Sequence, residues 1–366
     1  MGLIVQKYGG SSLDSPEKIK VLARRIVDRY DSGDRLVIVV SAVGKTTDTL
    51  EARAALLSAC PDPREVDMLI SVGERESISL MAIAINDIRP GLAVSFTGSQ
   101  IGLITDNNHR NARILEIRGD RLVEALEKGS IPVIAGFQGI STEKQITTLG
   151  RGGSDTTAVA VAAALKADLC EIYSDVRGVY SADPKFCPDA VLIEHLDHNT
   201  MLTISSLGAK VLRDAAVEYA HRLGVNITTG LSRTGDTGSL ICVDPRLNRN
   251  KFVSLVRNEN LFYAVGQNDG HLCDDLQNIR FFQRTESGST AIYSSKPNST
   301  ESLCCNSTSI VGFGIRSEQE KLCRMQELLR PSKIIAFELT DIKFEIYTEN
   351  VVKKDVFNDL HSLFFS

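Results

Sequence analysis

Hydrophobic residues in the first two-thirds of the chain alternate between short β-branched runs and longer stretches with helical spacing. Residues 36–40 form a continuous run of Leu, Val and Ile, which is typical of a strand buried on both faces of a sheet. The pattern predicts strands over 3–5, 36–40, 93–96, 131–135 and 170–173, and helices over 19–30, 67–86, 121–128 and 156–165. This β-α-β order predicts an α/β domain with a mainly parallel central sheet covered by helices on both faces.

The composition changes near residues 246–250. Glycine and alanine are dense before this point, whereas Asn, Ser, Phe and Cys are frequent after it. We place a domain boundary near residue 247, so the expected domains are 1–247 and 248–366. From Ser309 to Phe365 the pattern predicts strand, helix, strand, strand and helix, which is a smaller α+β domain.

Composition and charge narrow the class of protein. The chain has 366 residues, 43% hydrophobic and 24% charged, as expected for two globular domains. Its net charge of −5 gives no indication of a surface for nucleic acid or anionic membranes. No apolar run has the length of a membrane span, and the first residues lack a signal-peptide pattern. The eight cysteines include no C-x-x-C pair, so we expect free thiols in the reducing cytoplasm.

The segment KYGGSS, from Lys7 to Ser12, directly follows the first predicted strand. Adjacent glycines such as Gly9 and Gly10 let backbone N–H groups approach an anion closely, because no Cβ intervenes. Ser11 adds a hydroxyl donor, and Lys7 adds a full positive charge. The segment is equally compatible with a phosphate cradle and with a tight turn beside a surface lysine.

A second polar segment, SAVGKTTD at 41–48, follows the buried strand at 36–40. It is not a P-loop, because the glycine required at position 39 is Val39. We interpret it as a hydroxyl-rich loop at the carboxyl end of a strand, where open α/β sheets bind ligands. Glu74, in the segment SVGE, can bind an ammonium group. By itself it is better explained as a first-turn glutamate that complements the helix dipole.

The segment TLGRGGSDTT at 148–157 gives the strongest indication of a ligand site. It combines a glycine-rich turn, an arginine and the start of an Ala-rich helix. Arg151 can bind a carboxylate or phosphate with two parallel hydrogen bonds. We expect Ser154 or Asp155 to cap the helix. Capping alone does not account for three glycines and an arginine.

A further segment, YSDVRGVYSADPK at 173–185, combines turn residues, two tyrosines and a basic residue after a strand. Tyr180 can flank a nucleotide base and Lys185 can reach phosphates. Lys210 is another candidate cation, although an isolated lysine is more often on a solvated helix face.

Taken together and in this order, these segments resemble the aspartate kinases of the amino-acid-kinase superfamily. The family's K-[FY]-G-G-[ST]-S, V-V-S-A-[MV]-G-x-T-T-D and S-x-G-E motifs correspond to residues 7–12, 39–48 and 71–74. Its T-T-L-G-R-G-G-S-D-T-T-A motif is complete at 147–158, and its Y-[ST]-D-V-x-G-V-Y-[ST]-A-D-P-[RK] motif is complete at 173–185. The resemblance covers about residues 1–245 and implies the three-layer αβα amino-acid-kinase fold.

The resemblance also implies an activity. An aspartate kinase uses ATP, with Mg²⁺ bound to its phosphates, to phosphorylate the β-carboxylate of L-aspartate. The products are 4-phospho-L-aspartate and ADP, in the first step toward lysine, threonine and methionine. The carboxylate is ionised at pH 7, so the reaction needs no general base. Catalysis then consists of positioning and charge neutralisation.

The roles implied by the resemblance fall into three groups. The catalytic residues are Lys7, Asp155 and Lys210. Arg151 clamps the α-carboxylate of aspartate, Glu74 and Asp155 bind its ammonium, and Ser41, Thr47 and Ser154 orient its β-carboxylate. The ATP-binding residues are Lys7, Gly9, Gly10, Ser11, Gly152, Gly153, Ser174, Asp175, Tyr180, Asp183, Lys185 and Lys210. No residue is assigned as a direct ligand of a metal ion.

The sequence departs from the family in two regions. Arg213-Asp214 stands where the family usually has His-Pro, and we expect this pair at the rim of the domain, affecting regulation more than chemistry. The family normally carries two ACT modules, which bind effector amino acids and dimerise. Residues 309–317 resemble the opening of the second module, but the first lacks its D-x-P-G turn and effector-facing helix. We therefore expect an abbreviated ACT-like domain that retains homodimerisation, with weak or absent feedback by lysine or threonine.

Two other functions compete with this prediction. One is a related kinase that forms an acyl phosphate on another amino acid in specialised metabolism. The other is a catalytically silent amino-acid sensor. A silent sensor would be expected to have lost Lys7 or Asp155, and both residues are present.

Overall fold

The computed structural model describes residues 2–209, 211–243, 252–266, 278–285, 288–297 and 302–365. Their contacts divide into two compact units. As far as the residues are described, the first unit comprises 1–179, 194–202 and 211–245, and the second comprises 180–193, 203–210 and 246–366. Residue 247, where we place the domain boundary, lies outside the described residues, so that boundary stays a prediction.

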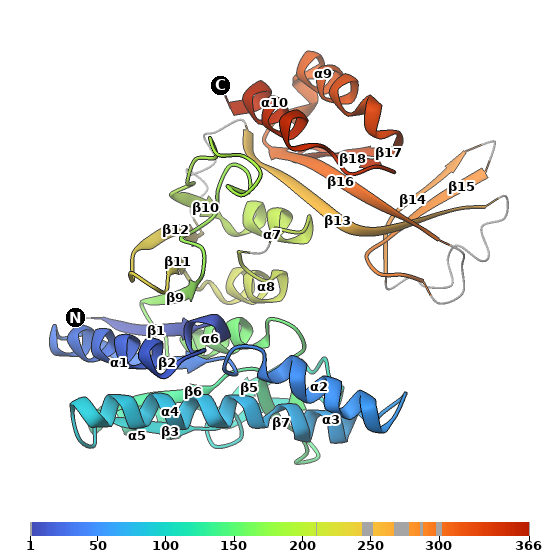
Figure 1. Ribbon diagram of the computed structural model, residues 1–366. Helices are drawn as coiled ribbons and strands as arrows, with labels where there is room; N and C mark the ends of the chain where they lie inside the picture. The colour runs from blue at the N-terminus through green and yellow to red at the C-terminus, as the bar shows by residue number, and fades with distance from the viewer. Residues whose placement is uncertain are drawn as a thin grey trace. The chain divides into compact units, whose positions relative to one another are not determined.

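The first unit is built on an eight-stranded sheet with the strand order β10-β12-β11-β9-β1-β2-β6-β3 (Figure 1). All neighbouring strands run parallel except the pair formed by β11 and β12. The strands are β1 (Leu3–Tyr8), β2 (Arg35–Val40), β3 (Ala93–Phe96), β6 (Ile131–Ala135), β9 (Leu169–Ser174), β10 (His195–Asp197), β11 (Ile227–Leu231) and β12 (Thr237–Cys242). The mainly parallel sheet predicted from the β-α-β pattern is confirmed.

Helices cover both faces of this sheet. Alternate residues of β2, namely Leu36, Ile38 and Val40, share a core with helices on one face, while Val37 and Val39 are fully buried on the other. Helices α1 and α4 pack together on the first face, and α6 packs on β1, β2 and β9 and against α8. The helices of this unit are α1 (Pro16–Asp31), α2 (Thr46–Leu57), α3 (Pro63–Ile70), α4 (Val72–Ile88), α5 (Asp120–Glu127), α6 (Gly153–Ala164) and α8 (Asp214–Leu223). The residues of α7 (His198–Ser206) are divided between the two units.

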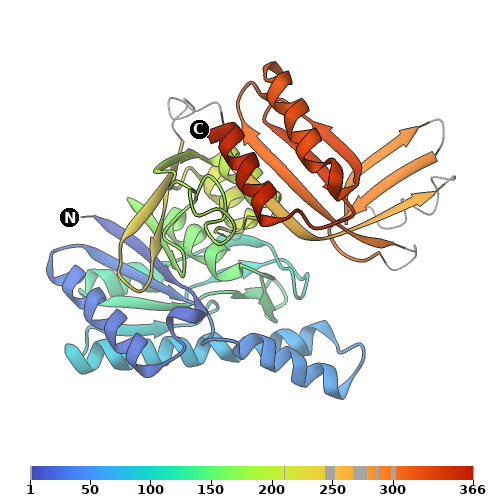
Figure 2. The same ribbon diagram turned by 45° about the horizontal axis from the view of Figure 1, so that its top comes forward.

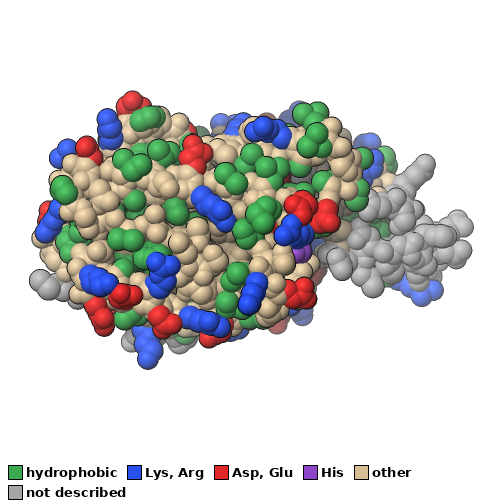
Figure 3. All heavy atoms as spheres, turned by 90° about the horizontal axis from the view of Figure 1, so that it is seen from below, with side chains coloured by type: hydrophobic (Ala, Val, Ile, Leu, Met, Phe, Trp, Pro, Cys, Tyr) green, Lys and Arg blue, Asp and Glu red, His purple; other side chains and the backbone are tan. Residues whose placement is uncertain are grey.

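Burial on two faces explains why β2 is apolar from Leu36 to Val40. Burying a Val, Leu or Ile side chain stabilises a fold by about 1.5–3 kcal/mol, so each of these five residues contributes to the core. On the outer surface seen in Figure 3, apolar side chains are scattered among charged ones. None of the described helices is long and apolar enough to cross a bilayer.

The helix predicted over 67–86 is interrupted. Two helices, α3 and α4, meet at Ser71, which ends the first and caps the second. The side-chain amide of Gln138 donates a hydrogen bond of 2.8 Å to the Ser71 carbonyl oxygen. The break between the two helices thus coincides with a hydrogen bond from a distant segment. The apolar periodicity correctly predicted helix in this region, but it did not predict the break at Ser71.

A second, four-stranded sheet was not predicted. Its order is β5-β4-β7-β8, and its strands contain only three or four residues each. They are β4 (Leu103–Thr105), β5 (Ile114–Ile117), β7 (Gln138–Ser141) and β8 (Ile146–Thr148). Strand β8 ends directly before the glycine-rich turn at 150–153, so this sheet positions that turn.

The second unit is an antiparallel six-stranded sheet with helices (Figure 2). The strand order is β14-β15-β13-β16-β18-β17. Helices α9 and α10 form a core with Leu255, Ile310 and Phe344 of the sheet. The elements are β13 (Phe252–Gly266), β14 (Ile279–Thr285), β15 (Gly288–Tyr293), β16 (Leu303–Gly312), α9 (Gln319–Leu329), β17 (Ile334–Leu339), β18 (Lys343–Thr348) and α10 (Lys354–Phe365). The element order predicted for 309–365 and the α+β class are confirmed.

Candidate active site

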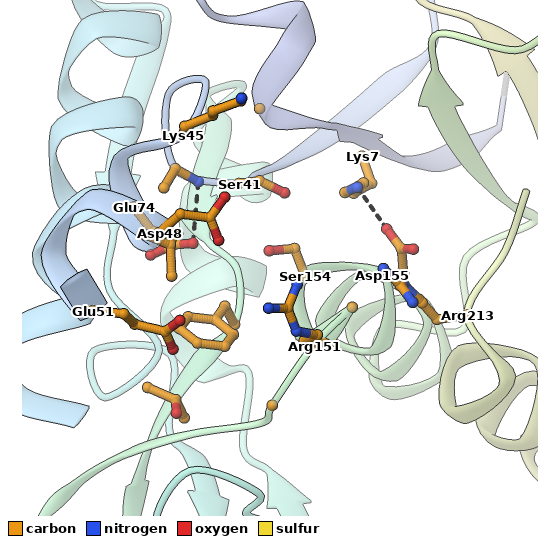
Figure 4. Close-up of a pocket in the computed structure, with 18 of the residues that line it drawn as sticks. Lys7, Ser41, Lys45, Asp48, Glu51, Glu74, Arg151, Ser154, Asp155 and Arg213 are labelled. Atoms are coloured by element: carbon orange, nitrogen blue, oxygen red, sulfur yellow. Dashed lines mark hydrogen bonds and ion pairs between the residues drawn. The ribbon is translucent and has the colours of Figure 1, made fainter. Parts of the chain in front are cut away.

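A cavity of about 450 Å³ lies in the first unit, at the carboxyl ends of β1 and β2 and the start of α6 (Figure 4). Residues from the predicted segments surround it. The predicted site residues that line the cavity are Lys7, Gly10, Ser41, Thr47, Glu74, Arg151, Gly152, Gly153, Ser154 and Asp155. The turn that follows β1 and the turn that carries Arg151 therefore share one cavity, as the sequence predicted.

Lys7 and Asp155 form an ion pair at one end of the cavity. The Lys7 Nζ lies 2.6 Å from Asp155 Oδ1, and each side chain is 11% exposed. Lys7 comes from β1 and Asp155 from the first turn of α6, so the pair joins the sheet to the helix. A buried ion pair loses solvation that the mutual attraction must offset, which makes each partner dependent on the other.

The glycine-rich turn has the backbone geometry that its composition indicates. Gly150 and Gly152 have φ angles of 74° and 77°, in the left-handed region that favours glycine. Helix α6 begins at Gly153 with Gly152 as its N-cap, and no side chain caps it. The prediction that Ser154 or Asp155 caps the helix is wrong, because both lie within its first turn and the Asp155 carboxylate binds Lys7 instead. Arg151 is exposed at the cavity, and its guanidinium lies next to Ser154 in Figure 4.

Gly10 is the point of closest approach between the first two turns. The Gly44 N–H donates a hydrogen bond of 3.0 Å to the Gly10 carbonyl oxygen. A Cβ on Gly10 would lie 2.5 Å from the Ala42 carbonyl oxygen, so no other residue fits.

Only the first part of the predicted loop at 41–48 is a loop, because α2 begins at Thr46 and contains Thr47 and Asp48.

Glu74 is buried at the opposite end of the cavity, in the first turn of α4. The Ala42 N–H donates a hydrogen bond of 3.1 Å to Glu74 Oε1. Oε2 is buried and has no hydrogen-bond partner among the described residues. Burial raises the pKa of Glu74 to about 8, against the opposing effect of the backbone hydrogen bonds it accepts. Burial thus favours the neutral form of this carboxyl group, and no other described residue engages its Oε2.

Asp67 supports the site from outside the cavity, and sequence reasoning did not identify it. Its side chain is fully buried and accepts a hydrogen bond of 2.6 Å from the Thr148 hydroxyl. It also accepts bonds from the Arg110 backbone N–H and lies 2.7 Å from His109 Nδ1. The carboxylate thus fixes the loop at 109–110 and the end of β8, three residues before Arg151.

Several charged residues of the cavity were not predicted as ligand-binding residues. Lys45, Asp48 and Glu51 come from the start of α2 and the residue before it, and Arg110 forms an ion pair with Glu51. Arg213 also lines the cavity, so the prediction that it lies at the rim of the domain and affects mainly regulation is not supported by its position. Lys45 and Asp48 lie inside a motif that the sequence marked. Arg110 begins a segment close to the family's G-N-A-R-I, and Arg213 was noted only as a departure from the family, whereas Glu51 carries no comparable signal.

Other predicted nucleotide-binding residues do not line this cavity. Gly9, Ser11, Ser174 and Asp175 belong to the first unit but are not among the lining residues. The Gly9 N–H donates to the Tyr173 carbonyl oxygen at 3.4 Å. Tyr180, Asp183 and Lys185 belong to the second unit, and Lys210 lies outside the described residues. Their roles stay predictions.

Comparison with known proteins identifies the family of the first unit. The model of the amino acid kinase family matches residues 2–228. Among curated proteins, an aspartokinase of Corynebacterium glutamicum is 50% identical over 242 residues, which are 66% of this chain and 57% of that protein. Aspartokinase 2 of Bacillus subtilis is 46% identical over 253 residues, which are 69% of this chain and 62% of that protein. The matched region thus spans about three-fifths of the length of these curated relatives.

Solved structures have the same fold. Aspartokinase III of Escherichia coli, in complex with aspartate and ADP, superposes with a TM-score of 0.82 over 100% of both chains at 20% identity. Aspartate kinase from Synechocystis has a TM-score of 0.60 at 31% identity, over 99% of this chain and 69% of that chain. These matches confirm the predicted α/β fold, followed by an antiparallel α+β region that resembles ACT domains. The chain belongs to the amino acid kinase family, and its similarity to aspartokinases agrees with the motifs read from its sequence.

Proposed function

We propose that the first unit transfers the γ-phosphoryl group of ATP to the β-carboxylate of L-aspartate, giving 4-phospho-L-aspartate and ADP. One observation carries the proposal. A single cavity has a lone buried carboxyl group, Glu74, at one end, the Lys7–Asp155 pair at the other, and Arg151 with Ser154 between them. A zwitterionic dicarboxylate and a polyphosphate need these groups in this arrangement. The similarity to aspartokinases supports the same choice of substrate.

The amino-acid end of the proposed site has complementary groups for each charge of aspartate. In the proposed complex the ammonium favours the ionised form of Glu74, whose Oε2 accepts from it, and Asp155 contributes further negative charge on the opposite wall. The Arg151 guanidinium holds the α-carboxylate through two parallel bonds. The hydroxyls of Ser41, Thr47 and Ser154 orient the β-carboxylate toward the phosphate end. All of these residues line the same cavity.

The phosphate end of the proposed site uses backbone as well as side chains. Helix α6 starts at Gly153, and the positive end of its dipole favours an anion there. Gly10 and Gly152, whose missing side chains admit Ala42 and Arg213, line this end of the cavity, and the Lys7 ammonium can donate to phosphate oxygens. Mg²⁺, when present, neutralises charge between the phosphates that hold it.

The reaction is an in-line displacement at the γ-phosphorus. An oxygen of the ionised β-carboxylate attacks, the bond to the β,γ-bridging oxygen breaks, and ADP leaves with that oxygen. No proton is transferred to or from the nucleophile, so the side chains act by positioning and by neutralising charge. In our proposal Lys7 and Lys210 stabilise the transferred group, and Asp155 holds Lys7 in place.

We propose the remaining nucleotide contacts from the sequence motifs alone. We assign Ser174, Asp175, Tyr180, Asp183 and Lys185 to the nucleoside pocket. Gly9 and Ser11 are assigned to the phosphate turn together with Gly10. These assignments depend on the match of residues 7–12 and 173–185 to the family motifs.

A hydroxamate assay tests the proposed activity and its substrate. Hydroxylamine traps an acyl phosphate, so the chain is incubated with ATP and Mg²⁺ and with aspartate, glutamate or N-acetylglutamate in turn. We expect hydroxamate from aspartate and little from the other two acids. N-acetylglutamate has no ammonium for Glu74, and glutamate is one methylene longer. Hydroxamate from glutamate alone would favour the alternative amino-acid kinase, and none from any acid would favour a silent sensor.

We also propose that the second unit serves as an ACT-like dimerisation domain and that the protein acts in the cytoplasm. The antiparallel sheet with α9 and α10 on one face supports an ACT-like module. Light scattering on the purified chain tests the homodimer. Inhibition at millimolar lysine or threonine tests regulation, and we expect weak or no inhibition by either. Strong inhibition would contradict the weakened feedback.

A further inference from the structure

Arg213 is a cation of the cavity that the proposed mechanism has not yet used. It lies directly before α8, is exposed, and lines the cavity. Among the described residues it forms no ion pair, whereas Lys7 and Arg110, two other cations of the same cavity, each bind a carboxylate. In Figure 4 the Arg213 side chain lies beside Asp155, on the same side of the cavity as Lys7.

The position of Arg213 is fixed by its contact with the glycine-rich turn. A Cβ on Gly152 would lie 2.1 Å from Arg213 Cγ and 2.8 Å from Arg213 Cβ. The stem of the arginine therefore crosses the backbone of Gly152, the residue between Arg151 and the start of α6. This places Arg213 between the residue assigned to the acceptor amino acid and the helix N-terminus assigned to phosphate.

The charges at this end of the cavity indicate a role for Arg213. Lys7 and Asp155 neutralise each other at 2.6 Å, so together they add no net charge to balance a triphosphate. Arg213 supplies the additional positive charge on this wall, beside the positive end of the α6 dipole. A planar guanidinium suits two oxygens of one phosphoryl group, because its N–H groups form a fork.

We propose that Arg213 binds the phosphoryl group that is transferred. The proposal rests on the proposed function, because it assumes that the acceptor lies at Arg151 and the polyphosphate at Lys7. Its consequence is specific: Arg213 should recognise the γ-phosphoryl group of a triphosphate and contribute little to the binding of a diphosphate.

The test compares the affinities of ADP and of AMP-PNP, a triphosphate analogue that is not cleaved, by calorimetry with Mg²⁺ and without amino acid. For Arg213→Gln we expect the dissociation constant of AMP-PNP to rise about tenfold or more, and that of ADP less than about threefold. Arg213→Lys, which keeps the charge but loses the fork, should lie between Arg213→Gln and the unchanged protein. Arg24→Gln is the matched control, since Arg24 is exposed on α1 and does not line the cavity.

Three results would overturn the proposal. Unchanged affinity for AMP-PNP in Arg213→Gln, with its melting temperature retained, removes the contact. An equal loss for ADP and AMP-PNP assigns Arg213 to the other phosphates. A raised KM for aspartate with unchanged nucleotide affinity assigns it to the amino acid.

The assignment of Arg213 and the proposed function can fail separately. If Arg213→Gln shows the selective loss of AMP-PNP affinity but the unchanged protein forms no aspartyl hydroxamate, the proposed function fails and Arg213 remains a phosphoryl-binding residue. If hydroxamate forms and the affinities do not differ, only the assignment of Arg213 fails.

Discussion

The two ends of the cavity each bury a carboxyl group in the first turn of a helix, but they treat it in opposite ways. Asp155 forms an ion pair with Lys7, whose Nζ lies 2.6 Å from its Oδ1. Among the described residues, Glu74 has only the Ala42 N–H as a donor from another segment, and burial raises the pKa of its carboxyl group to about 8. The carboxyl group of Asp155 is thus paired with a cation, whereas Glu74 Oε2 has no partner among the described residues. The difference lies in the neighbouring cation, not in the helix position.

Arg151→Ala should have the largest effect, because it removes the cation that stands between the two ends. Losing one partner of a desolvated charge pair costs about 2–5 kcal/mol, which corresponds to orders of magnitude in kcat/KM for aspartate. Steady-state kinetics with aspartate as the varied substrate measures this loss. Near-normal kinetics would contradict the assignment of Arg151 to the α-carboxylate.

Lys7→Met should break the paired end. It leaves Asp155 buried without its cation, and removing one partner of a buried pair destabilises a protein by about 3–5 kcal/mol. Because each side chain of this pair is still 11% exposed, the lower end of that range is expected. Chemical denaturation measures the free energy of unfolding.

The double variant Lys7→Met/Asp155→Leu is the control for the paired end. It should recover much of the stability lost in Lys7→Met, because no buried charge is left unpaired. It should remain inactive. A double variant no more stable than Lys7→Met would show that the loss comes from packing rather than from charge.

Glu74→Gln should sharpen the comparison through pH. The unfolded chain ionises Glu74 near its ordinary pKa of 4.5, whereas the folded protein holds the proton until about pH 8. The folded state thus binds more protons across this window, so its stability decreases as pH rises, by at most about 1.4 kcal/mol per pH unit from this group. Glu74→Gln should lack this decrease. Denaturation curves at several pH values between 5 and 8.5 compare the two proteins, and parallel pH profiles would contradict the proton on Glu74.

Gly152→Ala should have the smallest effect on stability. The methyl group must adopt a φ of 77° and displace the Arg213 stem, at a cost of about 1 kcal/mol or somewhat more. If Arg213 binds the transferred phosphoryl group, affinity for AMP-PNP should fall as it does in Arg213→Gln. Gly224→Ala is a useful control, since Gly224 has a similar φ of 68° and an added Cβ there meets no atom within 4 Å. A normal nucleotide affinity in Gly152→Ala would show that the contact with Gly152 does not position Arg213.

The sequence predicted the large sheet well, because strands such as β2 and β6 are buried on two faces and are therefore mainly apolar. It also predicted which turns meet, since the turns that line the cavity carry recognisable motifs. It did not predict the four-stranded sheet, whose strands of three or four residues are too short for a periodic pattern. It could not predict the break at Ser71, which coincides with a hydrogen bond from Gln138, 67 residues away.

The candidate site was predicted less completely than the sheet. Glycines and charged residues within the motifs, such as Gly10 and Arg151, were identified from the chain alone. Arg110 and Arg213 were not, because their place in the cavity depends on tertiary contacts with Asp67 and Gly152. A charged side chain outside a motif has the same appearance in the sequence whether it faces solvent or ligand.

Asp67 has a consequence for how selectivity can change in this fold. Its carboxylate ties α3 to Thr148, and Arg151 follows three residues later along the same stretch of backbone. The position of the Arg151 guanidinium therefore depends on α3, although no side chain of α3 lines the cavity. A small tilt of α3, introduced by substitutions in its packing against α2, would change the direction of the Arg151 guanidinium without replacing any residue that lines the cavity. Engineering toward longer or shorter acids can begin there.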